Sequence, residues 1–230
     1  MKEILTPAFI EAARDYFWLQ EKDYPQRLFF KVVCDRYRMD SIQRVIIYRG
    51  IFPSVENKAR LKRQTTSAEG MNLVVDTTNV VFRLNNYLCG RPVFLCTDGL
   101  LRDAGDAFGK QFPDDIHKRS IHLLIAYMKQ LGVRSAHCLI DQPADGSEMI
   151  QQELETAAPE FGYPLVIEST YPADRKMNGS SPCIIATADS EVIDHLPCPC
   201  IDLPRIILEK EFSPAFLSIP EILGTPTIIL

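Results

Sequence analysis

Four aspartates each follow directly on a short apolar run, and this pattern constrains the fold of the 230-residue chain more than any other. The runs end at Asp76, Asp98, Asp141 and Asp189. Segments of helical length separate them, which is typical of buried parallel strands alternating with helices. In an open α/β sheet the carboxyl ends of the strands form the ligand crevice, so we expect the four carboxylates to converge at one edge. Carboxylates gathered there repel one another unless a cation neutralises them, which predicts a site for Mg²⁺ or Mn²⁺.

The alternation of strands and helices extends over most of the chain. It predicts an α/β fold with a mostly parallel, Rossmann-like sheet flanked by helices. No G-x-G-x-x-G or G-x-x-x-x-G-K-[ST] motif occurs, so dinucleotide-binding and P-loop functions lose their main support. The apolar tail 222–230 is expected to form a packed terminal strand, which also offers a surface for a homodimer. The expected strands are 72–76, 92–97, 135–140, 165–169, 183–187 and 200–203. A segment of helical length near 79–88 separates the first two, and helices are expected near 115–131, 146–157 and 190–196.

A helical region precedes the first expected strand. Pro7 and Pro25 suit the starts of two helices, and Asp40-Ser41 is a plausible cap for a third, which Gly50 ends. The polar stretch 64–70 reads as a linker. We therefore predict an N-terminal helical region at 1–64 and an α/β domain at 71–230.

Basic residues are concentrated in that helical region. Between residues 27 and 63 there are ten Lys and Arg against three Asp and Glu, a net charge of +7, while the rest of the chain carries −12. This asymmetry is expected if basic helices at 27–63 hold a nucleic-acid backbone, with Tyr37 and Tyr48 available to stack on bases. The competing interpretation, a solvated basic face on amphipathic helices, is the more frequent meaning of such a run.

Polar neighbours at the strand ends suit a phosphate beside a cation. Asn79 stands three residues after the first aspartate and is expected to steer a phosphate oxygen or a metal-bound water. Arg102 follows the second aspartate and can clamp a phosphate, and Ser147 opens the helix after the third, whose N-terminus suits an anion. The plainer interpretation makes all these residues turn formers, helix caps or structural ion pairs. This plainer interpretation requires an independent structural role at each of four strand ends, whereas one shared site explains all four aspartates together.

Seven cysteines, an odd number, indicate reduced thiols that serve as small hydrophobes. Cys198-Pro199-Cys200 near His195 lacks a second ligand pair for zinc, so we interpret it as packing at a strand entry. No apolar run reaches the length of a membrane helix and the N-terminus does not resemble a secretory signal, so the expected location is cytoplasmic, with no membrane partner.

The chain resembles the PIN-like nuclease superfamily and its NYN relatives. In that superfamily a first strand ends Asp-x-x-Asn, as Asp76 and Asn79 do, and a later acid follows Thr or Ser, as in Thr187-Ala188-Asp189. More closely, it resembles a prokaryotic family of unknown function with an N-terminal helical region and a PIN-like domain. It departs from that pattern with Thr77-Thr78 in place of Gly-Tyr, and with Asp145 in place of a serine. The matching pieces are Arg36-Tyr37-Arg38, Tyr48-Arg49-Gly50, Thr97-Asp98-Gly99-Leu100-Leu101-Arg102-Asp103, Asp141 with Pro143 and Ser147, and Asp189-Ser190. The resemblance implies a nuclease ancestry and supplies no substrate.

Three functions therefore stand as hypotheses. The first is a Mg²⁺- or Mn²⁺-dependent phosphodiesterase, with RNA favoured over DNA, in which the four aspartates hold metal and act in catalysis while Asn79, Arg102 and Ser147 bind substrate. The second is a catalytically inactive PIN-like module for nucleic-acid binding or regulation, whose acids are caps and turn residues. The third is a Rossmann-like phosphohydrolase for small phosphate esters.

Overall fold

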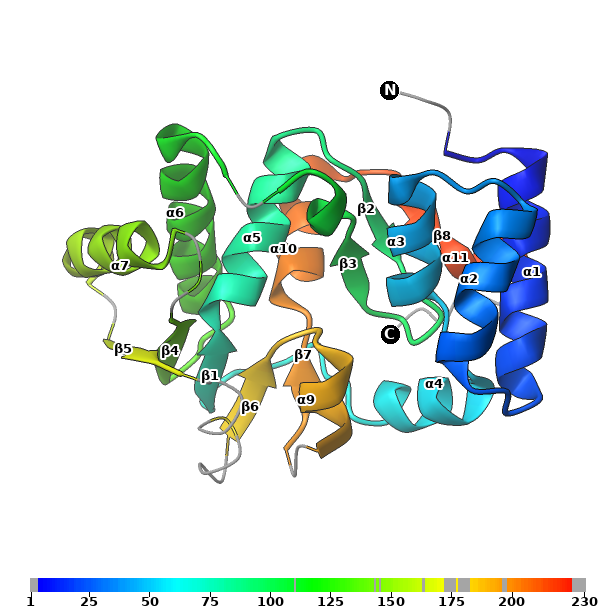
Figure 1. The fold of residues 1–230 in the computed structure, drawn as a ribbon. Coiled ribbons are helices and arrows are strands. Elements are labelled where there is room, and N and C mark those ends of the chain that lie inside the picture. The colour runs from blue at the N-terminus through cyan, green and yellow to red at the C-terminus, as the bar shows by residue number, and fades with distance from the viewer. Residues whose placement is uncertain are drawn as a thin grey trace. The chain divides into compact units, whose positions relative to one another are not determined.

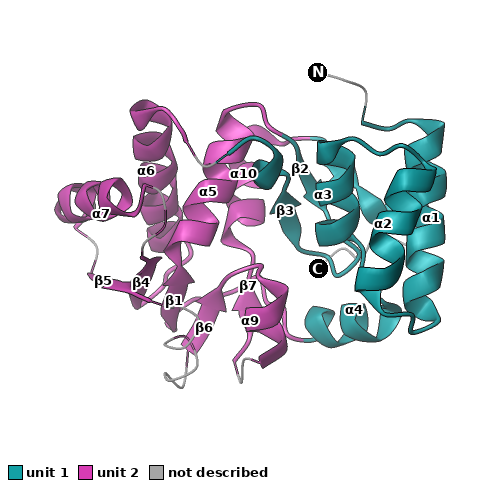
Figure 2. Ribbon diagram, in the orientation of Figure 1, with its two compact units in different colours: residues 1–62, 92–109, 215–229 teal, residues 63–91, 110–214, 230 magenta. Residues whose placement is uncertain are grey.

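In the computed structural model the chain divides into two compact units, which Figure 2 distinguishes by colour. Among the described residues, one unit contains those within 1–62, 92–109 and 215–224, and the other contains those within 63–91 and 110–214. The sequence predicts one continuous α/β domain from residue 71 onward, whereas 92–109 and 215–224 pack with the first unit. The residues that the structure describes are 4–109, 111–142, 144, 146–162, 164–171, 177, 183–195 and 198–224.

The second unit is built on a five-stranded sheet whose neighbouring strands all run parallel, which confirms the predicted α/β class (Figure 1). From β1 the chain moves outward through β4 to β5 and then returns to β6 on the other side of β1. The strand order therefore reverses between β1 and β6, and ligands of open α/β sheets bind at such a point. In spatial order the strands are β5 (Leu165–Thr170), β4 (Ser135–Asp141), β1 (Asn72–Asp76), β6 (Cys183–Ala186) and β7 (Cys200–Ile201).

Four of the described helices in this unit each follow a strand of the sheet. Two helices, α5 and α7, pack on β4, and α6 packs on both of them. The α10 helix is absent from the sequence prediction; Asp202 caps it by accepting a hydrogen bond of 3.2 Å from the Arg205 N–H, and Pro204 suits its first turn. The helices are α5 (Thr77–Leu88), α6 (Asp114–Gln130), α7 (Ser147–Phe161), α9 (Ser190–His195) and α10 (Leu203–Phe212).

The expected linker at 64–70 is bound to this unit. Gln64 forms a parallel bridge with Cys200, and the Thr65 N–H donates a hydrogen bond of 2.8 Å to the Cys200 carbonyl. At the other end of the stretch, the Gly70 N–H donates to the Gly132 carbonyl, also at 2.8 Å. These backbone bonds tie the polar stretch to the sheet and to the end of α6.

The first unit contains the three predicted helices as α1 (Pro7–Glu21), α2 (Gln26–Arg36) and α3 (Ser41–Gly50). A fourth, α4 (Ser54–Leu61), lies within the predicted helical region but was not predicted individually. Asp40 caps α3 in a reciprocal capping box with Gln43, as its position before the apolar run predicts. Apolar faces of the first three helices share a core that includes Phe9, Tyr16 and Ile46, all fully buried.

A small second sheet completes this unit. It contains β2 (Val93–Leu95) between β3 (Leu101–Asp103), which is antiparallel to it, and β8 (Leu217–Ser218), which is parallel. The prediction that the strand at 92–97 joins the main sheet is therefore wrong. Its partners are too short to be recognised as strands, and an apolar run does not reveal which sheet will accept it.

Short elements and undescribed residues surround these sheets. A 3₁₀ turn, η1 (Gly105–Ala107), follows β3, and α11 (Ile219–Leu223) follows β8. The expected C-terminal strand at 222–230 begins within α11, and 225–230 lie outside the described residues. Among the described helices, none combines the length and the apolar character that a membrane crossing needs.

Candidate functional site

The best-placed acid lies at the point where the strand order reverses. Asp76 is the last residue of β1 and is buried, with 7% of its surface exposed. Its Oδ2 accepts a hydrogen bond of 2.8 Å from the hydroxyl of Thr187, the residue that follows β6. Two adjacent strand ends are thus joined by one hydrogen bond, which holds the Asp76 carboxylate in a fixed orientation.

Asp141 ends β4, the neighbour of β1 on its other side. Its side chain is half-buried, and its backbone N–H donates a hydrogen bond of 3.1 Å to the hydroxyl of Thr78 in the first turn of α5. Asp76 and Asp141 therefore stand at the carboxyl ends of adjacent strands. The sequence predicts both strand ends but not that the two strands are neighbours.

Asp189 stands near the end of β6 and makes hydrogen bonds at the start of α9. Its backbone N–H donates to the Thr187 hydroxyl at 3.1 Å, and its Oδ1 accepts from the N–H groups of Glu191 and Val192 at 2.8 and 3.3 Å. These bonds make Asp189 a cap of α9, as the plainer interpretation expects. Within the described part of the chain its Oδ2 has no hydrogen bond, so one carboxylate oxygen remains for a ligand.

Asn79 is held by a buried arginine that sequence patterns did not reveal. Arg83, one turn later on α5, is fully buried and donates from Nη2 to Oδ1 of Asn79 at 2.6 Å. Its Nη1 lies 3.9 Å from Oδ1 of Asp202, a buried acid that follows β7. Because a guanidinium only donates hydrogen bonds, the amide atom of Asn79 that faces it must be the oxygen. The amide nitrogen of Asn79 therefore points elsewhere and offers N–H groups to a ligand.

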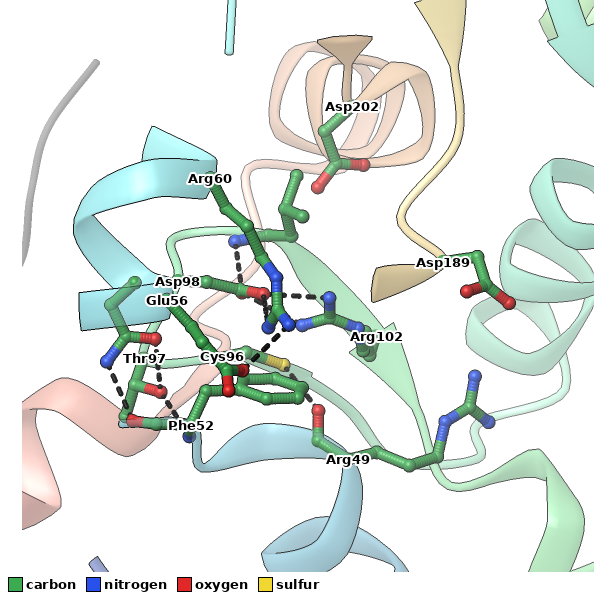
Figure 3. A network of polar contacts seen from close by, with 12 residues as sticks. Arg49, Phe52, Glu56, Arg60, Cys96, Thr97, Asp98, Arg102, Asp189 and Asp202 are labelled. Atoms are coloured by element: carbon green, nitrogen blue, oxygen red, sulfur yellow. Dashed lines mark hydrogen bonds and ion pairs between the residues drawn. The ribbon is translucent and has the colours of Figure 1, made fainter. Parts of the chain in front are cut away.

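Asp98 does not follow a strand of the main sheet. It follows β2 of the small sheet, is fully buried, and accepts two hydrogen bonds of 2.8 Å from the Nη1 and Nη2 groups of Arg102 (Figure 3). Arg60 donates to Oδ2 of Asp98 at 3.3 Å and to Glu56 at 2.8 Å (Figure 3). Asp98 therefore does not stand at the end of a main-sheet strand as expected, because β2 pairs with β3 and β8 and not with that sheet.

Phe52 is part of the same cluster. The guanidinium carbons of Arg60 and Arg102 lie 4.3 and 4.8 Å from its ring centroid, so both cations contact the ring. Burial alone would lower the pKa of Arg102, but the ion pair with Asp98 outweighs it and raises the pKa above its ordinary value. Arg102, predicted to clamp a phosphate, is instead half of a buried structural ion pair.

Ser147 is buried at the first position of α7, directly after Gly146, whose φ of +79° suits a glycine. The imidazole of His117 lies beside Gly146: a Cβ placed on this glycine would stand 3.6 Å from Nε2. His117 is 2% exposed, and its Nδ1 accepts a hydrogen bond of 3.0 Å from the Asn85 amide. Burial lowers the pKa of His117, and Asp114 opposes the shift in part. The neighbouring Asp145 lies outside the described residues.

The basic residues at 27–63 divide into two groups. Arg44, Arg49 and Arg60 form ion pairs within the first unit, and Arg63 donates to the Ile193 carbonyl in the second. These four side chains therefore make structural contacts within the protein. The other six are exposed: Arg27, Lys31, Arg36, Arg38, Lys58 and Lys62.

The stretch that contains these strand ends matches a known family model. Residues 65–205 match the model described as Domain of unknown function (DUF5616). The chain belongs to this family. Residues 8–63 match a second model, Protein of unknown function (DUF434). Uncharacterized protein MJ0935 of Methanocaldococcus jannaschii is 20% identical over 185 residues, which cover 80% of this chain and 88% of that protein. No solved structure matches.

The strand-end acids of the DUF5616 stretch limit how a cation can bind. Among the described residues, no group of three or more His, Cys, Asp or Glu side chains is arranged to hold a metal ion together. Mg²⁺, however, commonly takes only one or two carboxylates and completes its shell with waters and substrate phosphates. Asp76 and Asp189, with Thr187 hydrogen-bonded to both residues, suit that sparse kind of site and not an all-protein cage.

Proposed function

We propose that this protein is a metal-dependent phosphodiesterase that acts on RNA, with its reaction centre at the carboxyl ends of β1 and β6. The observation that carries the proposal is the buried Asp76 carboxylate, oriented by Thr187 where the strand order of a parallel sheet reverses. The same edge offers Asp189 and Asp141 on either side. The nuclease resemblance of the Asp76–Asn79 pattern supports the same assignment.

Mg²⁺ or Mn²⁺ is the proposed cofactor, which Asp76 would hold directly and Asp141 and Asp189 would hold through water. A bound cation of this kind lowers the pKa of a coordinated water and stabilises the leaving oxygen of a phosphodiester. Thr187 keeps the Asp76 carboxylate in one orientation, and the Asp189 Oδ2 is available to accept a hydrogen bond from the attacking water.

Asn79 is proposed to contact the substrate and not the cation. Arg83 occupies the oxygen of its amide, so the amide presents N–H donors, which match a phosphate oxygen and would repel a metal ion. The six exposed cations of the first unit are proposed to hold flanking RNA backbone. The exposed Tyr48 is available for stacking on a base.

A second candidate function is a catalytically inactive binding module. Two observations favour it: Asp189 already caps α9, and the described residues contain no cluster of three metal-binding side chains. In that case the basic helices would still bind RNA, but the bound RNA would not be cleaved when Mg²⁺ or Mn²⁺ is added.

A cleavage assay separates these functions. Wild type, Asp76→Asn and Glu160→Gln are incubated with end-labelled single-stranded RNA and Mn²⁺, with and without EDTA. Glu160 is an exposed acid in the last turn of α7, at the other end of that helix from Ser147, and serves as the matched control. The proposal expects EDTA-sensitive cleavage by wild type and Glu160→Gln and its loss in Asp76→Asn. RNA binding without cleavage would favour the inactive module, and hydrolysis of p-nitrophenyl phosphate alone would favour a small-ester phosphohydrolase.

A further inference from the structure

Two thiols of the second unit lie in contact. Cys183 is the first residue of β6, and Cys198 precedes β7 by two residues. Their Sγ atoms are 3.3 Å apart, and both residues are buried, with 3% and 9% of their surfaces exposed. They share an apolar cluster with Met177, Ile185 and Val192.

The strand register brings these two cysteines together. β6 and β7 run parallel, with Ile185 opposite Cys200 and Ala186 opposite Ile201. The same offset of 15 residues places Cys183 opposite Cys198, just before the ladder begins. Neighbouring strands lie about 4.8 Å apart, and disulfides accept Cα separations of roughly 4.4–6.8 Å. A bond between the two sulfurs therefore needs a small rotation of two side chains and no movement of the backbone.

We propose that Cys183 and Cys198 are a redox-active pair that forms a disulfide when the protein meets a small-molecule disulfide such as oxidised glutathione. The thiolate of one cysteine attacks a sulfur of glutathione disulfide and releases one glutathione thiolate. The second cysteine then attacks the mixed disulfide and releases the other. The two protein thiols lose two electrons and two protons in total, and one glutathione disulfide becomes two molecules of glutathione.

The reaction is slow in the native state. Burial and the adjacent Cys198 thiol raise the pKa of the Cys183 thiol well above its ordinary value, and thiol exchange requires the thiolate. Access of glutathione disulfide therefore depends on local opening of the structure around Cys183 and Cys198. Once formed, the disulfide closes a covalent loop that contains Thr187, Asp189 and α9, so it fixes one side of the candidate site to the sheet.

The stabilising effect follows from the unfolded state. A cross-link between residues 15 positions apart restricts the unfolded chain, while the native geometry already accommodates the bond. For a protein of this size we expect the melting temperature to rise by about 5–10 °C on oxidation.

Thiol counting and peptide mapping test the proposal. Wild type is incubated with oxidised glutathione, alkylated in denaturant and digested, and its melting temperature is measured before and after. The seven thiols should fall to five, with one peptide pair joined through Cys183 and Cys198 and a higher melting temperature. Two matched variants complete the test. Cys198→Ser should keep its melting temperature on oxidation. Cys89, at the C-terminal end of α5, is partly exposed, and Cys89→Ser should respond to oxidation like wild type.

Three results would overturn the proposal. One is the retention of all seven thiols after prolonged oxidation at a temperature that opens the structure locally. Another is a disulfide that maps to a different pair. The third is a melting temperature that rises equally in wild type and Cys198→Ser.

Discussion

The hydroxyl of Thr187 donates a 2.8 Å hydrogen bond to Oδ2 of Asp76 and thereby connects the ends of β6 and β1. Both residues are buried, at 1% and 7% exposure. Outer partners that orient a metal-binding carboxylate typically change metal affinity by about 10–100-fold when removed. Loss of the Thr187 hydroxyl should therefore weaken cation binding at the proposed site.

Thr187→Val should weaken Mn²⁺ binding about tenfold or more, because the Asp76 carboxylate loses the donor that orients it. Thr187→Ser keeps the hydroxyl and should bind like wild type. The measurement is a calorimetric titration of both variants. Equal affinities for Val and Ser would show that this hydrogen bond does not serve metal binding.

The Asp98–Arg102 pair should matter for stability and not for the cation. Arg102→Met leaves a buried carboxylate with one fewer guanidinium, which should lower the free energy of unfolding by roughly 3–5 kcal/mol. Urea denaturation measures the loss, and exposed Arg36→Met is the control. If Arg102→Met instead kept its stability and lost RNA binding, the original expectation that Arg102 clamps a phosphate would be restored.

Asn79→Asp should weaken RNA binding by roughly tenfold, because a carboxylate replaces the N–H donors and repels phosphate. Fluorescence anisotropy with a short 2′-O-methyl oligoribonucleotide measures this affinity, since the modified strand resists cleavage. Asp141→Asn should not reproduce the effect, because its amide would add a donor. Unchanged RNA binding together with stronger Mn²⁺ binding would place Asn79 beside the cation and contradict the orientation argument.

Buried His117 should make the protein less stable in mild acid. Its pKa is lowered in the folded state, so the unfolded chain binds more protons once the pH falls below the ordinary value of about 6.5. The free energy of unfolding should therefore decrease as the pH falls through that window and be fully retained above it. Urea midpoints at several pH values should show a steeper decline for wild type than for His117→Gln. Parallel declines would assign the acid sensitivity to other groups.

The sequence predicts the parallel sheet well but misplaces one of the strands that precede its aspartates. Five of the expected strands appear as β1, β4, β5, β6 and β7 within about two residues, because their apolar runs are continuous and helices separate them. The strand at 92–97 was assigned to the wrong sheet, because its pairing depends on β3 and β8, which have only three and two residues.

Arg83 and the cysteine pair were beyond sequence reasoning for a different reason. A lone arginine in a helix usually faces solvent, and nothing local shows that Arg83 is buried between Asn79 and Asp202. Cys183 and Cys198 meet only because β6 and β7 pair in one register. Such contacts between distant residues arise from tertiary structure and leave no periodic signal in the chain.

Calorimetric titration of Mn²⁺ into wild type, Asp76→Asn and Glu160→Gln tests the central claim most directly. The account predicts binding in the micromolar range by wild type and Glu160→Gln, and its loss in Asp76→Asn. Absence of binding to wild type, with or without the 2′-O-methyl oligoribonucleotide, would contradict a cation site at the ends of β1 and β6, as would undiminished binding by Asp76→Asn.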